Sequence, residues 1–219
     1  MAILPRLLAS LGVTVRLTVV SLAFAVLLGM LFCLFSISKN RALRLLSAVY
    51  LDVIRGTPLL VQAFFIYFGI PQLVQLSFPE FRMSPDAAGI ITLSLNAGAY
   101  LSEIFRSGIL AVDKGQMEAA RSLGLPKSRA MAKIIIPQAI RIVTPSVVNQ
   151  FIITLKDTSI LSVIGIRELT KTGNLIIATT FESFKTWLIV AVMYLIVIKI
   201  LSLVSRHIER RLRNGTGSR

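Results

Sequence analysis

Polar and charged side chains within long apolar stretches are the residues of this chain best suited to chemistry. A charge at the centre of such a stretch costs on the order of 2.5–3.5 kcal/mol on membrane-insertion scales, so it usually faces a partner or a water-filled cavity. A carboxylate there can bind an ammonium group, and an amide can bind either end of a zwitterion. We predict that a polar path is lined by Asp52, Gln62, Asn96, Tyr100, Glu103, Lys156 and Asp157.

The same charges have a simpler explanation as local ion pairs. Asp52 and Arg55 are three residues apart, as are Glu103 and Arg106, and residues at this spacing lie on one face of a helix. Lys156 and Asp157 can neutralise each other across an interface between two subunits. The sequence leaves both the path and the pairing hypotheses open.

Several kinds of reactive site are excluded by residue type. The sequence contains no Gly-x-x-x-x-Gly-Lys-Ser/Thr loop for binding phosphate. Its one histidine, His207, lies in a basic tail, and its one cysteine, Cys33, lies in an apolar run, so no nucleophile-and-base set, disulfide framework or metal cluster is expected. We therefore predict that the chain is not an enzyme and binds no cofactor of its own.

The elements that hold these residues are membrane-spanning helices. The chain has 219 residues, of which 55% are apolar and only 16% charged. A spanning helix needs about 20 mostly apolar residues, and the charge-free runs 17–37 and 56–78 meet this length. We predict an all-α polytopic membrane protein with five spans, the third capped by Ser84 ahead of Pro85. The spans are expected at about 11–37, 48–77, 86–112, 142–166 and 186–206.

The basic residues predict the orientation of these spans. Cytoplasmic loops carry an excess of lysine and arginine, and here such residues gather after the first span, after the third span and in the tail. The N-terminus is therefore expected outside and the C-terminus inside. Membrane topology accounts for most of the net charge of +14, so we expect no nucleic-acid partner. The residues on the basic side are Lys39, Arg41, Arg44, Lys114, Arg121, Lys127, Arg129, Lys133, Arg141, Arg206, Arg210, Arg211, Arg213 and Arg219.

The cytoplasmic loop 114–141 has too much pattern for a plain connector. Its helix formers around Ala119 and Ala120 are followed by Gly124, which stops a helix, and by Pro126, which restarts one. We expect two short helices at an angle, the second ending at Pro137. The small side chains of Ala119 and Ala120 are expected to be exposed, allowing another backbone to approach closely.

This loop carries a specific resemblance. Glu118-Ala119-Ala120, Gly124, Ile134, Ile136 and Pro137 resemble, in type and spacing, the cytoplasmic signature of ATP-binding-cassette (ABC) importer permeases. Three further stretches look like the polar amino-acid uptake branch of that family, which includes binding-protein-dependent histidine, glutamine and arginine permeases. These are 55–62 (RGTPLLVQ), 100–109 (YLSEIFRSGI) and 156–159 (KDTS).

The resemblance implies a single transmembrane permease domain over residues 1–219 with the type I importer fold. It implies that the loop couples to a separate ATPase through Glu118, Ala119, Ala120, Gly124 and Pro137, and that this ATPase dimer binds the ATP and Mg²⁺. It further implies a second permease copy or a sister permease, an extracytoplasmic solute-binding protein, membrane lipid around the spans and a bacterial cytoplasmic (inner) membrane location. The implied substrate is a polar amino acid.

Three other hypotheses remain. The same machinery can import an amino-acid derivative such as an opine. A non-transporting membrane sensor or assembly protein would explain the spans but not the loop around Glu118. An ion-driven secondary transporter usually has more spans arranged in repeated halves, and no such repeat is found in this sequence.

Overall fold

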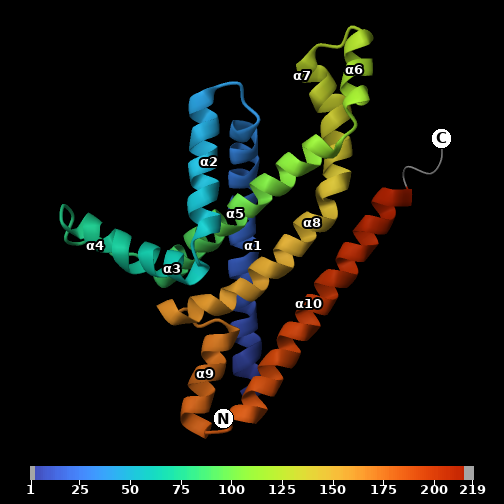
Figure 1. The fold of residues 1–219 in the computed structure, drawn as a ribbon. Helices are drawn as coiled ribbons and strands as arrows, with labels where there is room; N and C mark the ends of the chain where they lie inside the picture. Colours follow the sequence, from blue (N-terminus) through green and yellow to red (C-terminus); the bar gives the residue numbers. More distant parts are fainter. Residues whose placement is uncertain (1–2, 215–219) are drawn as a thin grey trace.

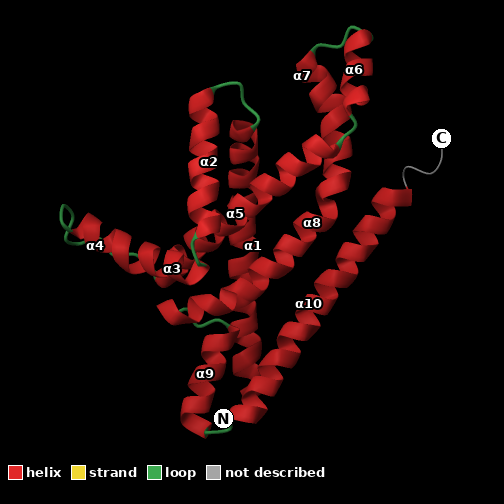
Figure 2. Ribbon diagram, in the orientation of Figure 1, coloured by secondary structure: helices red, strands yellow, loops and turns green. Residues whose placement is uncertain are grey.

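The computed structural model describes residues 3–214, and within them the chain is helical with short connections and no strand (Figure 2). Arg219, one of the predicted cytoplasmic basic residues, lies outside this range. The elements in order are α1 (Ile3–Ser36), α2 (Arg41–Gly56), α3 (Leu59–Phe64), π-helix η1 (Phe65–Gly69), α4 (Ile70–Gln75), α5 (Pro85–Ala111), α6 (Lys114–Ser122), α7 (Lys127–Ala130), π-helix η2 (Met131–Ile135), α8 (Ile136–Asp157), 3₁₀-helix η3 (Thr158–Ile164), α9 (Leu169–Thr180) and α10 (Ser183–Asn214).

Helices α1 and α5 form the centre of the bundle because small residues let their backbones approach closely. A Cβ atom built on Gly29 would lie 2.8 Å from the Cβ of Leu101 and 3.2 Å from the carbonyl oxygen of Gly98. The Ser94 hydroxyl donates a hydrogen bond across the contact to the Ser21 carbonyl at 3.1 Å. This helix pair is the scaffold on which the other spans pack.

The second predicted span, over about 48–77, is not one continuous helix but a bent pair of helical segments. Helix α2 and the segment α3–η1–α4 meet at an angle of 105° (Figure 1). Proline at 58 disfavours helical backbone at Thr57, which is extended with φ −120° and ψ 144°. The apolar run 56–78 therefore forms an arm whose base, at Ala63 and Ile66, packs on the bundle core, while its α4 end extends outward (Figure 1).

The third and fifth spans agree well with their predicted ranges. Helix α5 covers Pro85–Ala111, and the Ser84 hydroxyl accepts a hydrogen bond from the Ala87 amide at 3.2 Å, so the predicted cap is confirmed. Helix α10 begins at Ser183, near the predicted start of the last span.

The helix that carries the fourth predicted span, 142–166, begins well before residue 142. A continuous helical segment runs over Lys127–Ile164 through α7, η2, α8 and η3. The expectation that Pro137 ends a helix is wrong, because this residue lies in the first turn of α8, directly after η2. A proline, which has no amide hydrogen to donate, is tolerated in the first turn of a helix because the residues there make no i−4 hydrogen bond. The loop is thereby joined to a membrane helix without a break.

Four helices are long and apolar enough to cross a membrane, and the number rises to five if the bent pair counts as one span. The α1–α2 connection and the α6–α7 hairpin lie at one end of the molecule, and α9 lies at the other (Figure 1). Glu168, fully buried, holds α9 in place by accepting hydrogen bonds from the amides of Thr170 and Lys171 and from the Tyr194 hydroxyl of α10. Burial raises the pKa of this carboxyl, and the amide hydrogen bonds oppose the rise.

Candidate functional site

The predicted coupling loop folds as a helical hairpin at the tip of the structure (Figure 1). Its first helix, α6, starts at an Asp113 cap, where the carboxylate accepts a 2.7 Å hydrogen bond from the Gly115 amide. It ends where Gly124 adopts a left-handed φ of +81°, which glycine reaches without a Cβ clash. The amides of Leu123, Gly124 and Leu125 bond back to carbonyls of α6, so the turn is well defined.

The two alanines of the signature have different environments. Ala119 is exposed, as expected, but Ala120 is only 2% exposed, so the expectation that both present a free surface is wrong for Ala120. The helix turns Ala120 toward the α7–η2 segment, and Met117 packs on an apolar cluster that includes Ile135 and Ala139. Glu118 and Pro137 are exposed. The hairpin is therefore rigidly attached to α8.

Leu123 is a surface residue that sequence reasoning missed. Its side chain is 83% exposed at the end of α6, outside the candidate spans. A single exposed leucine is common on protein surfaces, but this one directly precedes Gly124 of the predicted coupling signature. The sequence contained one sign of this exposure, because Leu123 is a large apolar residue placed directly before the helix-stopping Gly124, in a mostly polar stretch.

Charged residues of α2 and α5 form one network rather than two local pairs. Glu103 pairs with Arg106 at 2.9 Å, as the i, i+3 spacing predicts, and also with Arg55 of α2 at 3.4 Å. The Arg55 guanidinium lies 5.6 Å from the centre of the Tyr100 ring. Asp52 has no ion pair within the described residues, so the predicted Asp52–Arg55 pair is not formed.

Gln62 stabilises the break between α2 and α3. Its amide nitrogen donates hydrogen bonds to the carbonyls of Ile54, at 2.7 Å, and Thr57, at 3.0 Å. Its amide oxygen accepts one from Asn96 of α5 at 3.3 Å. Two predicted path residues therefore meet, and both are at most 9% exposed. Their first task is to satisfy the carbonyl groups that the break leaves without helical partners.

We predict that Gln62→Leu destabilises the folded permease. The change leaves two carbonyl groups without their side-chain donor, and an unsatisfied buried polar group costs about 1–3 kcal/mol. The thermal midpoint of the detergent-solubilised chain, followed by size-exclusion chromatography after heating, should fall. Gln72→Leu on the exposed surface of α4 is the matched control, and an equal loss in both variants would contradict this role.

A shallow hollow beside this break collects polar groups at the C-terminal end of α2. It is lined by Asp52, Arg55 and Tyr100 together with Leu51 and Gly56. Lys156 and Asp157 lie at the C-terminal end of α8. No ion pair joins either of them to the Arg55–Glu103 network within residues 3–214. Lys156 and Asp157 are therefore not part of this network. The other five predicted path residues lie near the α2–α5 contact, namely Asp52, Gln62, Asn96, Tyr100 and Glu103.

Residues 17–214 match the family described as "Binding-protein-dependent transport system inner membrane component". The chain belongs to this family. Its members are permease subunits of ABC importers, whose ATPase is a separate subunit, so the chain is a multi-pass membrane transporter subunit and not an enzyme. The family relationship implies an ATPase and a solute-binding protein as partners.

Individual relatives agree with this assignment. The chain is 40% identical over 200 residues to a putative glutamine transport system permease protein GlnP of Rickettsia bellii, covering 91% of this chain and 89% of the relative. It is 38% identical over 210 residues to the glutamine transport system permease protein GlnP of Escherichia coli K12, covering 96% and 94%. These relatives do not favour a sensor, an assembly protein or a carrier of amino-acid derivatives.

A solved amino acid ABC transporter, crystallised with histidines, superposes with a TM-score of 0.87 at 39% identity, covering 94% of both chains. The methionine ABC transporter MetNI shares the fold with a TM-score of 0.78 at 16% identity, covering 97% of this chain and 99% of that one. The type I importer fold expected from the sequence is thereby supported.

Proposed function

We propose that this chain forms half of the membrane path of an importer for glutamine or closely related polar amino acids. Similarity to glutamine permeases over more than nine-tenths of the chain carries this proposal. Glutamine is a zwitterion with a neutral amide side chain, so its recognition calls for one cationic, one anionic and several amide-binding groups. Asp52, Arg55 and Tyr100 supply such groups in one hollow.

We propose that the hairpin end of the molecule faces the cytoplasm and the α9 end faces outside. The α1–α2 connection and the hairpin together carry most of the basic residues in the described loops, and positive loops stay on the cytoplasmic side. The N-terminus then lies outside and the C-terminus inside, in a bacterial cytoplasmic membrane.

The ATPase is proposed to dock on the exposed surface of the hairpin. Leu123 enters an apolar socket of the ATPase, while Glu118, Ala119 and Gly124 contact its rim. Burying a leucine side chain contributes about 1.5–3 kcal/mol. Because α7 continues into α8 without a break, a movement of the hairpin is transmitted to the membrane helices. ATP and Mg²⁺ bind to the partner ATPase.

A second permease copy or a sister permease is proposed to pack against the arm α3–η1–α4. The α4 end of the arm extends away from the bundle (Figure 1), and four large apolar side chains within residues 65–76 are 55–81% exposed, namely Phe65, Phe68, Leu73 and Leu76. Pairing through the arm would enclose the adjacent hollow of Asp52, Arg55 and Tyr100 between two copies. The solute-binding protein then delivers the amino acid from the α9 side, with Asn96, Glu103, Lys156 and Asp157 further along the path.

Uptake by proteoliposomes tests the substrate and the path together. Vesicles that contain this permease, its ATPase and its binding protein should accumulate radiolabelled glutamine only when ATP is present on the side of the membrane that carries the ATPase. Among unlabelled amino acids added in excess, glutamine should lower this uptake the most. Tyr100→Ala should lower uptake about tenfold, the equivalent of about 1.4 kcal/mol, with ATPase binding unchanged. Leu110→Ala, an exposed position on the same helix, should have little effect. Competition by other solute classes but not by glutamine would contradict the proposed substrate, and normal uptake by Tyr100→Ala would contradict the path.

A further inference from the structure

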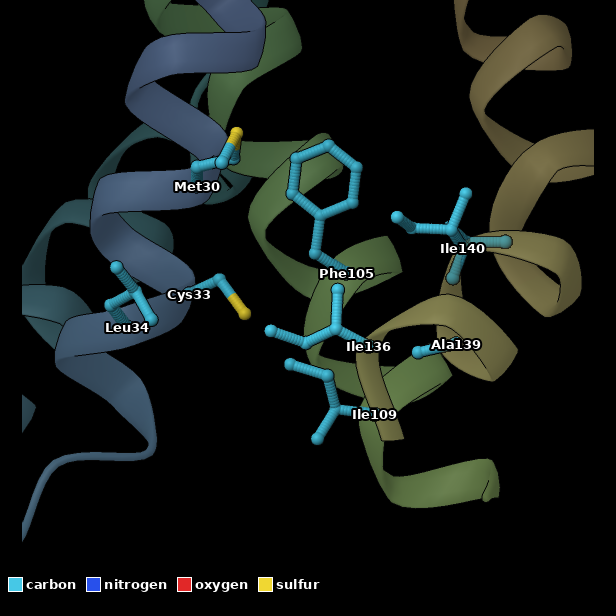
Figure 3. A pocket seen from close by; sticks show the side chains of 9 residues that line it. Met30, Cys33, Leu34, Phe105, Ile109, Ile136, Ala139 and Ile140 are labelled. Carbon is cyan, nitrogen blue, oxygen red and sulfur yellow. The ribbon is translucent and has the colours of Figure 1, made fainter. Parts of the chain in front are cut away.

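An apolar groove lies between α1, α5 and α8 (Figure 3), and it shares no lining residue with the polar hollow. Met30 and Cys33 come from α1, Phe105 and Ile109 from α5, and Ile136 and Ile140 from α8. Every lining residue is apolar except Cys33, whose thiol points into the groove (Figure 3). The α8 wall, residues 136–143, is about 10 Å long at 1.5 Å per residue.

The position of the groove indicates what it holds. All three of its walls belong to helices long and apolar enough to cross a membrane, so in the proposed orientation the groove would face the inner half of the bilayer. The side chains at its rim, Met30 and Ile140, are 53% and 55% exposed. A narrow slot with an apolar lining at this depth fits a single flexible hydrocarbon chain.

Two lysines lie close in sequence to the walls of the groove and are candidates for binding the head group. Lys133 precedes Ile136 by about one helical turn, and Lys39 follows the end of α1 in the adjoining connection. Both side chains are exposed, and within the described part of the chain neither has a carboxylate within 4.0 Å. A lysine near a membrane surface attracts anionic lipid by about 1 kcal/mol.

We propose that this groove binds one acyl chain of an anionic phospholipid, with the phosphate paired to Lys133. The proposal rests on the proposed cytoplasmic location of the hairpin end, which places the groove in the inner leaflet. A bound chain would fill the wedge between α1 and α8 just where α8 continues from the hairpin. Lipid would then support the segment that joins the ATPase contact to the membrane helices.

Cys33 is the only cysteine of the chain. It is only 3% exposed, but its thiol faces the groove (Figure 3), so its slow alkylation reports on access through the groove. The permease–ATPase complex is delipidated in neutral detergent, and alkylation of Cys33 by N-ethylmaleimide is followed by the mass of the permease chain. Phosphatidylglycerol in mixed micelles should slow alkylation at least about fivefold, and phosphatidylcholine with the same chains less than about twofold, as expected for one added charge interaction. Lys133→Gln should remove the difference between the lipids, whereas Lys127→Gln, an exposed lysine of α7, should keep it.

A variant that fills the groove provides a second test. Ile140→Trp should reduce the phosphatidylglycerol that co-purifies with the complex, measured by extraction and mass spectrometry, and Leu31→Trp, an exposed α1 position outside the groove, should not. Equal protection by both lipids would overturn the proposal. The proposal would also be overturned if Cys33 did not react in the lipid-free complex but did react in the isolated permease. That result would mean that a second permease copy covers the groove. ATPase co-purification and glutamine uptake, measured on the same samples, report on the proposed function separately.

Discussion

Replacing Gly124 by valine is expected to abolish ATP-driven uptake while leaving the permease in the membrane. Gly124 has a φ of +81° and no neighbouring atom within 4 Å of a Cβ position, so backbone strain and not crowding is the issue. A residue with a side chain costs about 1–2 kcal/mol in this conformation, and a β-branched one is a clear outlier there. Relief of the strain would turn Leu123 away from its docked direction. Uptake and ATPase co-purification should each fall about tenfold or more.

Gly12→Val is the control for this substitution. Gly12 lies in α1 with open space around its Cβ position and no left-handed backbone, so the same change in volume should leave coupling intact. Normal co-purification and uptake in Gly124→Val would show that the turn does not present the docking surface.

Replacing Gly108 by leucine is expected to prevent stable folding. A Cβ atom at Gly108 would lie 2.0 Å from the Cγ1 of Val143 and 3.3 Å from the carbonyl oxygen of Ala139, so α5 and α8 would have to separate. Overpacking of this kind costs typically about 1–3 kcal/mol and occasionally more. Because α8 carries the hairpin, the yield of monodisperse permease after solubilisation should fall severalfold, and the ATPase should be lost with it.

Gly12→Leu again gives the comparison, since the added side chain there meets no neighbour within 4 Å. Equal recovery and equal thermal midpoints of Gly108→Leu and Gly12→Leu would contradict the close contact between α5 and α8.

The sequence predicted features that depend on local residue type. The Ser84 cap, the stop at Gly124 and the range of α5 follow from capping chemistry and apolar length, and the structure confirms them. The family resemblance rested on fixed spacings in the loop, which is why the permease assignment is also confirmed. Each of these signals is contained in a few neighbouring residues.

Features that depend on packing between segments were predicted less well. Apolar content alone cannot distinguish a straight span from the 105° bend at Thr57-Pro58, because the side chain that supports the bend, Gln62, acts through tertiary hydrogen bonds. Pro137 reads as a helix end, yet the preceding π-helix lets the chain continue. Ala120 is buried by η2 and Arg55 is paired with Glu103 across two helices, and no spacing along one helix predicts either contact.

The central claim is that the α6–α7 hairpin, with Leu123 at its tip, is the docking surface of the ATPase. The most direct test places a photoreactive benzophenone amino acid at position 123, and separately at position 76, which is similarly exposed at 81% but at the end of the apolar arm. After illumination of membranes containing the whole importer, we expect an adduct between permease and ATPase from position 123 and none from position 76. An ATPase adduct from position 76 with none from position 123 would contradict the proposed docking surface.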